Sequence, residues 1–112
     1  MKIFNGEKMI ADNVERAESM FMRFRGFMLR SSIDDGEGLL IPRCNWIHTL
    51  FMRQEIDAVY LDENNTIIDV QSNVKPWRIC RPRFRAKSTL ELYSGAIESK
   101  SLRIGEVLTC SA

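Results

Sequence analysis

The sequence predicts a small, mainly β fold: a compact β-sandwich or partly closed barrel with one short helix near residues 19–26. Short apolar or alternating segments follow one another along the chain, each bounded by Gly, Pro, Asn or Asp, which is typical of many short strands. The length of 112 residues, with 45% hydrophobic and 28% charged residues, fits one globular domain over residues 1–112. No repeat or linker divides the chain.

The first strands are predicted by the turn signal Asn5-Gly6, because both central positions of a tight hairpin turn require a positive φ. Strands are therefore expected over residues 2–4 and 7–10. Alternation of apolar and polar side chains predicts a further strand over residues 13–18.

The short helix is expected over residues 19–25. Ser19 can cap its N-terminus, and Gly26 marks its end. Its apolar side chains recur at a spacing that places them on one face: Met20, Phe21, Phe24 and Phe27.

The remaining strands are predicted by β-branched and aromatic residues between turn residues. They are expected over residues 39–41, 46–52, 57–62, 66–71, 87–93 and 106–110. The apolar run 58–61 is typical of a central strand covered on both faces. Pro76 and Pro82 exclude a regular central strand from most of residues 75–85, since proline has no N–H for the ladder. Residues 95–100 are expected to form a turn or a short helical piece.

The composition indicates in which cell compartment the protein is found and whether it binds a cofactor. The longest apolar run has four residues, whereas a membrane helix needs about 20. The N-terminus lacks the apolar core of a secretory signal, so we expect a soluble cytoplasmic protein without a membrane partner. Cys44, Cys80 and Cys110 have no metal or redox spacing and are expected to be reduced thiols. No cofactor and no metal site is predicted, and the oligomeric state is left open.

Residues 23–30 read Arg-Phe-Arg-Gly-Phe-Met-Leu-Arg, close to an R-x-x-G-L-M-x-R string, and further strings follow in order along the chain. They lie at residues 38–40, 47–52, 56–62 and 90–95 and at Gly105. Together they resemble domain-of-unknown-function family 192. The resemblance implies a compact, mainly β fold but no reaction, because that family is uncharacterised and has no agreed catalytic residues. Phe27 stands where Leu is usual, Tyr93-Ser94 where Pro-Ala is common, and residues 53–56 lack a common proline.

One candidate ligand-binding site joins the single histidine to a carboxylate. Asp57 shares its strand face with apolar residues, so we expect its carboxylate to be buried and paired with Arg23 or Arg30. Two interpretations of this ion pair are compatible with each other. In the first, it attaches the helix region to the sheet. In the second, it lies with His48 at the bottom of a pocket that binds a carboxylate or phosphate. Glu91 faces away from its apolar strand neighbours and can join either arrangement.

His48 also supports a catalytic alternative. A histidine on an apolar face is usually a hydrogen-bonded structural residue, but its pKa near neutrality also suits a general base. A hydrolase would use Cys44 or a serine as nucleophile, with His48 as base and Asp57 as its orienting partner. The sequence contains the residue types but no nucleophile motif such as G-x-S-x-G.

The strongest local anomaly is a run of positive charge between residues 75 and 87. The formal net charge is only +1, yet this segment contains six cations and no acid. These candidate anion-binding residues are Lys75, Arg78, Arg81, Arg83, Arg85 and Lys87. Trp77 and Phe84 lie among them and add stacking surface of the kind that single-stranded nucleic acid binders use. The alternative is a solvated loop whose cations meet the protein's own acids.

These observations predict a non-catalytic binding module for a small anionic ligand or an acidic protein partner. The competing hypotheses are the hydrolase that uses His48 with Asp57 and a nucleic-acid binder that uses residues 75–87.

Overall fold

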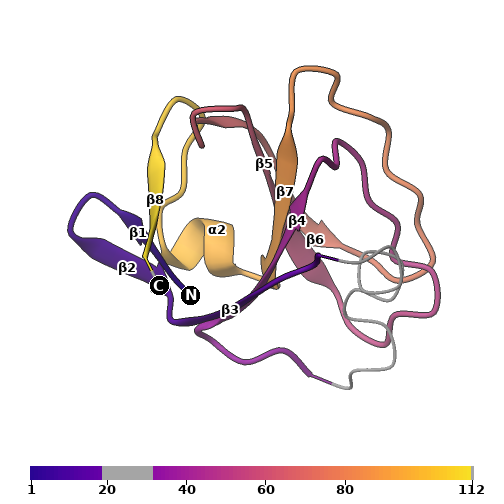
Figure 1. Cartoon of the computed structure of the whole chain (residues 1–112). Coiled ribbons are helices and arrows are strands. Elements are labelled where there is room, and N and C mark those ends of the chain that lie inside the picture. The colour runs from indigo at the N-terminus through magenta and orange to yellow at the C-terminus, as the bar shows by residue number, and fades with distance from the viewer. Residues whose placement is uncertain (19–31, 112) are drawn as a thin grey trace.

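The computed structural model describes residues 1–18 and 32–111, and its strands form two sheets (Figure 1). The smaller sheet has the order β2-β1-β8 and contains β1 (Lys2–Asn5), β2 (Lys8–Ala11) and β8 (Leu108–Ser111). The larger sheet has the order β3-β4-β7-β5-β6. Its strands are β3 (Asn13–Arg16), β4 (Glu37–Pro42), β5 (Ile56–Leu61), β6 (Ile67–Val74) and β7 (Ser88–Tyr93).

The main hydrophobic core lies between the two sheets. The short helix α2 (Ala96–Ser99) sits in this space in Figure 1. Side chains from both sheets and from α2 form the core, among them Ile3, Leu108, Val59, Leu92 and Ile97. Alternation along β5 and β7 directs every second side chain into it. The mainly β fold is thus confirmed, as two sheets that enclose a core.

Pairing is antiparallel in both sheets except between β3 and β4, which run parallel. Gly38 lies at the crowded junction where β4 meets its two neighbours. A Cβ atom at this position would lie 3.1 Å from a methyl carbon of Leu92 and 3.2 Å from a methyl carbon of Val14. Glycine therefore allows the close approach of strands that the core requires.

A second hydrophobic cluster covers the other face of the five-stranded sheet. It contains the side chains of Ile56, Ala58 and Tyr60 from β5, and Leu39 and Ile41 from β4. Ile47, Met52, Cys80 and Ala86, which lie in long connections, pack over them. All six residues of β5 are buried, so the expectation of a strand covered on both faces is confirmed.

Most predicted strands are present, with ends that differ by a few residues; β6 continues to Val74. The strand predicted over residues 46–52 is wrong. Only His48 forms an isolated β-bridge, to Ile79. Its partner segment contains two prolines and Trp77 at φ 64°, so a regular ladder cannot continue along it. The helix predicted at residues 19–26 lies outside the described residues. In the described part of the chain, no helix combines the length and the hydrophobicity needed to cross a membrane.

Candidate functional site

Two connections of the larger sheet, residues 43–53 and 75–87, pair with each other. The N–H of Cys80 donates to the Ile47 carbonyl (3.0 Å), and the N–H of Arg83 donates to the Asn45 carbonyl (2.8 Å). We call these two segments the paired-loop arm. Figure 1 shows it on the side of the five-stranded sheet that faces away from the smaller sheet. Side chains distant in sequence are thereby presented on one surface.

Thr49 holds the two segments of the arm together. It is fully buried, and its hydroxyl donates to the Lys75 carbonyl (2.6 Å) and accepts from the Arg78 N–H (2.9 Å). Its backbone carbonyl accepts from the Trp77 N–H (2.9 Å). The Thr49 hydroxyl therefore satisfies two backbone groups of residues 75–78, and the Thr49 carbonyl binds the Trp77 N–H of the same turn.

Replacing Thr49 with valine should lower the free energy of unfolding by about 1–3 kcal/mol, because the Arg78 N–H and the Lys75 carbonyl lose their buried partner. Thr49→Ser, which keeps the hydroxyl, should lose less. Urea unfolding of both variants measures the difference. A larger loss in Thr49→Ser than in Thr49→Val would show that the methyl group, and not the hydroxyl, carries the contribution.

The arm exposes aromatic rings. Phe51 and Trp77 lie against each other with ring centroids 4.7 Å apart and ring planes 59° apart, yet they are 52% and 56% exposed. Their backbones have φ of 66° and 64°, the left-handed region that side-chain-bearing residues rarely adopt. Trp46 (44% exposed) and Phe84 (85%) add two further rings. This end of the protein is therefore apolar as well as basic.

Five of the six cations predicted to bind anions are exposed on the arm, and none of them forms an ion pair with an acid of the described residues. They are Lys75, Arg78, Arg81, Arg85 and Lys87. The expectation that the cations of this segment meet the protein's own acids is met by the ion pair of Arg83. Hydrogen bonds from backbone N–H groups lower the pKa of the Asp62 carboxyl, and the charge of Arg85 also helps to lower it.

Arg83 has a structural position. Its Nε donates to a carboxylate oxygen of Asp69 (2.9 Å), and a terminal nitrogen donates to the Gln71 side chain (3.2 Å). The guanidinium also lies 4.4 Å from the centre of the Tyr60 ring. Burial raises the pKa of the Tyr60 hydroxyl, although the charge of Arg83 opposes this shift. Arg83 thus fastens the arm to β5 and β6.

Two of the cysteines belong to the arm, Cys44 half-buried and Cys80 buried. Burial raises the pKa of the Cys80 thiol, and Arg83 only partly offsets this effect. The thiol of Cys44 donates to the Trp46 carbonyl (2.8 Å). A thiol whose pKa is raised is less ionised and less reactive.

His48 lies on the arm and is half-buried. Its Nδ1 accepts from the Leu50 N–H (3.2 Å), and its ring centre lies 6.2 Å from that of Trp46. Its neighbours Ile47 and Thr49 point inward and are buried. His48 therefore belongs to the same surface as the exposed rings.

Asp57 is fully buried, as its position on the strand predicts, but it lies on the opposite face of the sheet. One oxygen accepts from the Asn73 N–H (2.8 Å). The other accepts from the N–H groups of Gly95 (3.1 Å) and Ile97 (2.9 Å), at the start of α2. The predicted partners Arg23 and Arg30 lie outside the described residues. Backbone groups satisfy both oxygens, so Asp57 acts as an anchor for α2.

Glu91 is the second buried acid, on the face opposite to Asp57. It pairs with Leu39 and Ala58 across the ladders and is 4% exposed. Its Oε2 atom is buried, and no hydrogen-bond partner for it lies among the described residues. Burial raises its pKa to about 8, so the carboxyl group is mostly protonated at neutral pH.

The structure does not bring the predicted histidine and carboxylates together. His48 lies on the arm, Asp57 faces the core between the sheets, and Glu91 points into the second cluster. The hydrolase arrangement, which needs His48 beside Asp57, is therefore absent from the described residues. The sequence interpretation also missed Thr49, Phe51 and Trp46, because nothing in the linear sequence indicates that residues 43–53 pair with 75–87.

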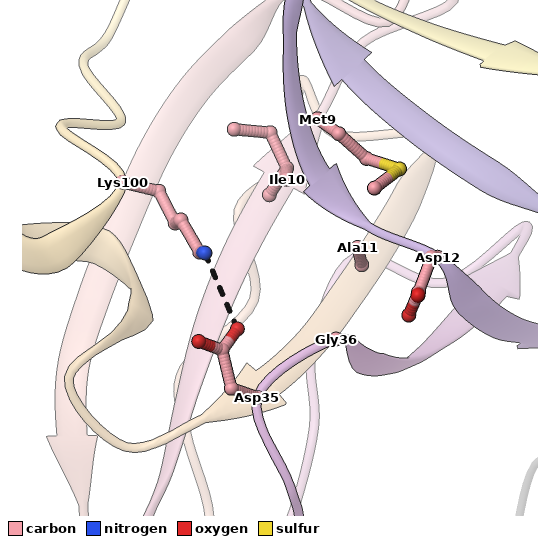
Figure 2. A pocket seen from close by; sticks show the side chains of 7 residues that line it. All are labelled: Met9, Ile10, Ala11, Asp12, Asp35, Gly36 and Lys100. Atoms are coloured by element: carbon pink, nitrogen blue, oxygen red, sulfur yellow. Dashed lines mark ion pairs between the residues drawn. The ribbon is translucent and has the colours of Figure 1, made fainter.

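A shallow pocket lies far from the arm, where β2 meets the turn before β4 (Figure 2). Its volume is about 150 Å³, and Lys100 closes one side through an ion pair with Asp35 (3.2 Å). Asp12 is also part of the lining. With two carboxylates and one cation that is already paired, this pocket is poorly suited to an anion. No three potential metal-ligating side chains cluster among residues 1–18 and 32–111.

Comparison with known proteins identifies a family. The profile of domain-of-unknown-function family 192, described as Uncharacterized ACR, matches residues 2–110. A UPF0127 protein of Thermococcus sibiricus is 33% identical over 88% of this chain, which spans 66% of that relative's length. A UPF0127 protein of Pyrococcus furiosus is 34% identical over 90% of this chain and 89% of its own.

Solved structures with a similar fold exist, and two of them have TM-scores of 0.84 and 0.78 to this chain. The first is a crystal structure of a protein of unknown function from Novosphingobium aromaticivorans, with 15% sequence identity. The match covers 97% of this chain and 82% of the other. At this level of identity, the similarity concerns the arrangement of strands only.

Proposed function

Because this chain belongs to domain-of-unknown-function family 192, whose description assigns no reaction, we propose its function from its surface: it is a non-catalytic binding module that recognises an anionic partner through the paired-loop arm. The observation that carries the proposal is the group of five exposed cations without ion-pair partners in the described chain. Unpaired cations of one sign on one surface attract and orient anions.

The cations do not act alone on this surface. Three of the five exposed cations are arginines, whose planar guanidinium groups suit bidentate contacts with carboxylates and phosphates. Exposed aromatic rings lie between them, and Trp and Arg are the side chains that contribute most in binding interfaces. The arm therefore resembles a contact surface more closely than an ordinary solvated loop.

An extended partner is favoured over a small anionic ligand. The arm is an exposed surface, and the described pocket lies elsewhere and carries carboxylates. Catalysis receives no support from the candidate residues, since Asp57 is engaged by backbone N–H groups and Glu91 is sealed under the second cluster. We place the module in the cytoplasm, where its three free thiols stay reduced.

Retention on immobilised heparin, a general polyanion, tests the proposal. The double variant Arg78→Glu with Arg81→Glu should elute at a clearly lower salt concentration than the wild type, because two arm cations become repulsive. The matched control is Lys2→Glu with Arg103→Glu, two exposed cations away from the arm. Each pair of substitutions lowers the formal net charge of +1 by four. Equal loss of retention in both double variants would show that net charge, and not the arm, determines binding.

A further inference from the structure

We propose that the anionic partner of the paired-loop arm is a single-stranded nucleic acid, whose bases stack on Phe51 and Trp77 and whose phosphates contact the neighbouring cations. This inference rests on the proposed function and adds the chemical class of the partner.

The two rings are positioned as a stacking platform. Their planes are 59° apart, so neither ring covers the face of the other completely, and about half of each residue's surface faces solvent. A base needs an accessible ring face. In a duplex the bases already stack on one another, whereas a single strand offers free base faces.

The backbone at both ring-bearing residues has an unfavourable conformation. Phe51 and Trp77 both adopt a positive φ, which glycine adopts far more easily than an aromatic residue. Thr49 stabilises both turns: its hydroxyl contacts the Lys75 carbonyl and the Arg78 N–H, and its carbonyl accepts from the N–H groups of Trp77 (2.9 Å) and Met52 (3.1 Å). A loop without a partner gains little from solvent-exposed rings at these positions. A partner that contacts the rings accounts for their presence.

Two exposed rings lie among the cations of residues 75–87. Trp77 lies between Lys75 and Arg78, and Phe84 lies between Arg83 and Arg85. A single strand offers both bases and phosphates, and proteins that bind it combine stacking rings with a basic track. An acidic protein surface would satisfy the cations, but it has no regular feature that matches the rings between them.

The experiment measures fluorescence anisotropy of two labelled oligomers, each about twelve nucleotides long, which is within the site size of ~4–16 nucleotides seen for such binding folds. One is oligothymidine, and the other is an abasic deoxyribose-phosphate chain of equal length. Wild-type protein should bind oligothymidine about tenfold or more tightly than the abasic chain, since stacking is lost without bases. If four phosphates are contacted, the logarithm of affinity should fall with the logarithm of salt concentration with a slope of about −3.

The matched variants separate stacking from charge. Phe51→Gly with Trp77→Gly should weaken oligothymidine binding to about the level of the abasic chain and leave the salt slope unchanged. Its melting temperature should stay close to that of the wild type, because glycine relieves the backbone strain and offsets the lost ring contact. Ile79→Ala removes an apolar side chain, 71% exposed on the same arm, and should leave binding unchanged.

Each remaining outcome has a distinct meaning. Equal binding of both oligomers by the wild type would overturn stacking whether or not the glycine variant folds, and would leave the anion-binding arm intact. No binding of either oligomer, with heparin retention that still depends on Arg78 and Arg81, would overturn the nucleic-acid inference and indicate an acidic protein partner. Loss of that heparin dependence as well would overturn the proposed function itself.

Discussion

Replacing Asp57 with alanine should lower the free energy of unfolding by about 3–5 kcal/mol. The side chain is fully buried, and its two oxygens accept hydrogen bonds from the N–H groups of Asn73, Gly95 and Ile97. Alanine would leave these three donors without partners in a place that water cannot reach. The start of α2 and the end of β6 would both lose their hydrogen bonds to β5, although the sequence of α2 and β6 is unchanged.

Two variants define the origin of this loss. Asp57→Asn keeps one acceptor oxygen and should cost less than alanine. Asp62→Ala removes a carboxylate that also accepts backbone hydrogen bonds, from Asn64 and Thr66 (2.9 Å each), but lies nearer the surface. Water can replace it there, so the loss should be clearly smaller than that of Asp57→Ala. Urea unfolding measures all three, and a stability of Asp57→Ala close to that of the wild type would refute the anchoring role.

Replacing Glu91 with glutamine should raise the free energy of unfolding, and this gain should increase with pH. Burial raises the pKa of Glu91 from 4.5 to about 8 in the folded protein. Between these values the unfolded chain has released the proton while the folded chain retains it, so the folded state binds more protons. Stability of the wild type must therefore fall as pH rises from about 4.5 to about 8, by up to about 1.4 kcal/mol per pH unit from this group.

Glutamine does not titrate, so the Glu91→Gln variant lacks this fall in stability with rising pH. The free energy of unfolding of Glu91→Gln relative to the wild type should rise by about 4 kcal/mol between pH 5 and pH 8. Urea unfolding at several pH values in this range measures it, and contributions from other groups cancel in the difference. Glu15→Gln, at an exposed position of β3, is the control and should follow the wild-type pH dependence. A Glu91→Gln curve parallel to the wild type would show that Glu91 is ionised in the fold at neutral pH.

Local patterns predicted most of the fold. A two-residue turn joins β1 to β2 as predicted, but its central residues are Gly6 and Glu7 and not Asn5 and Gly6, since Asn5 pairs with Lys8 and only Gly6 has a positive φ (63°). In β7, alternation correctly placed Leu90 and Leu92 in the main core. Residues 46–52 misled the prediction, since their aromatic and apolar content suits a strand while their partner segment cannot extend a ladder.

The candidate site was less accessible to such reasoning. Burial of Asp57 followed from its strand position, but its donors lie 16, 38 and 40 residues away in the chain, and their approach depends on how β6 and α2 pack. Arg83 looked equivalent to its basic neighbours, yet the structure engages it with Asp69. Sequence position does not reveal which member of a charge run finds an acid.

The linear order of residues was sufficient for strand content, for the inward direction of Asp57 and for the concentration of positive charge at residues 75–87, because each depends on neighbours a few positions away. Folding alone determined that this basic segment lies against residues 43–53, that Phe51 meets Trp77, and that one buried acid is satisfied while Glu91 is left without a described partner. Such contacts join segments tens of residues apart, and they form only where core packing outweighs the entropy lost when the chain is ordered.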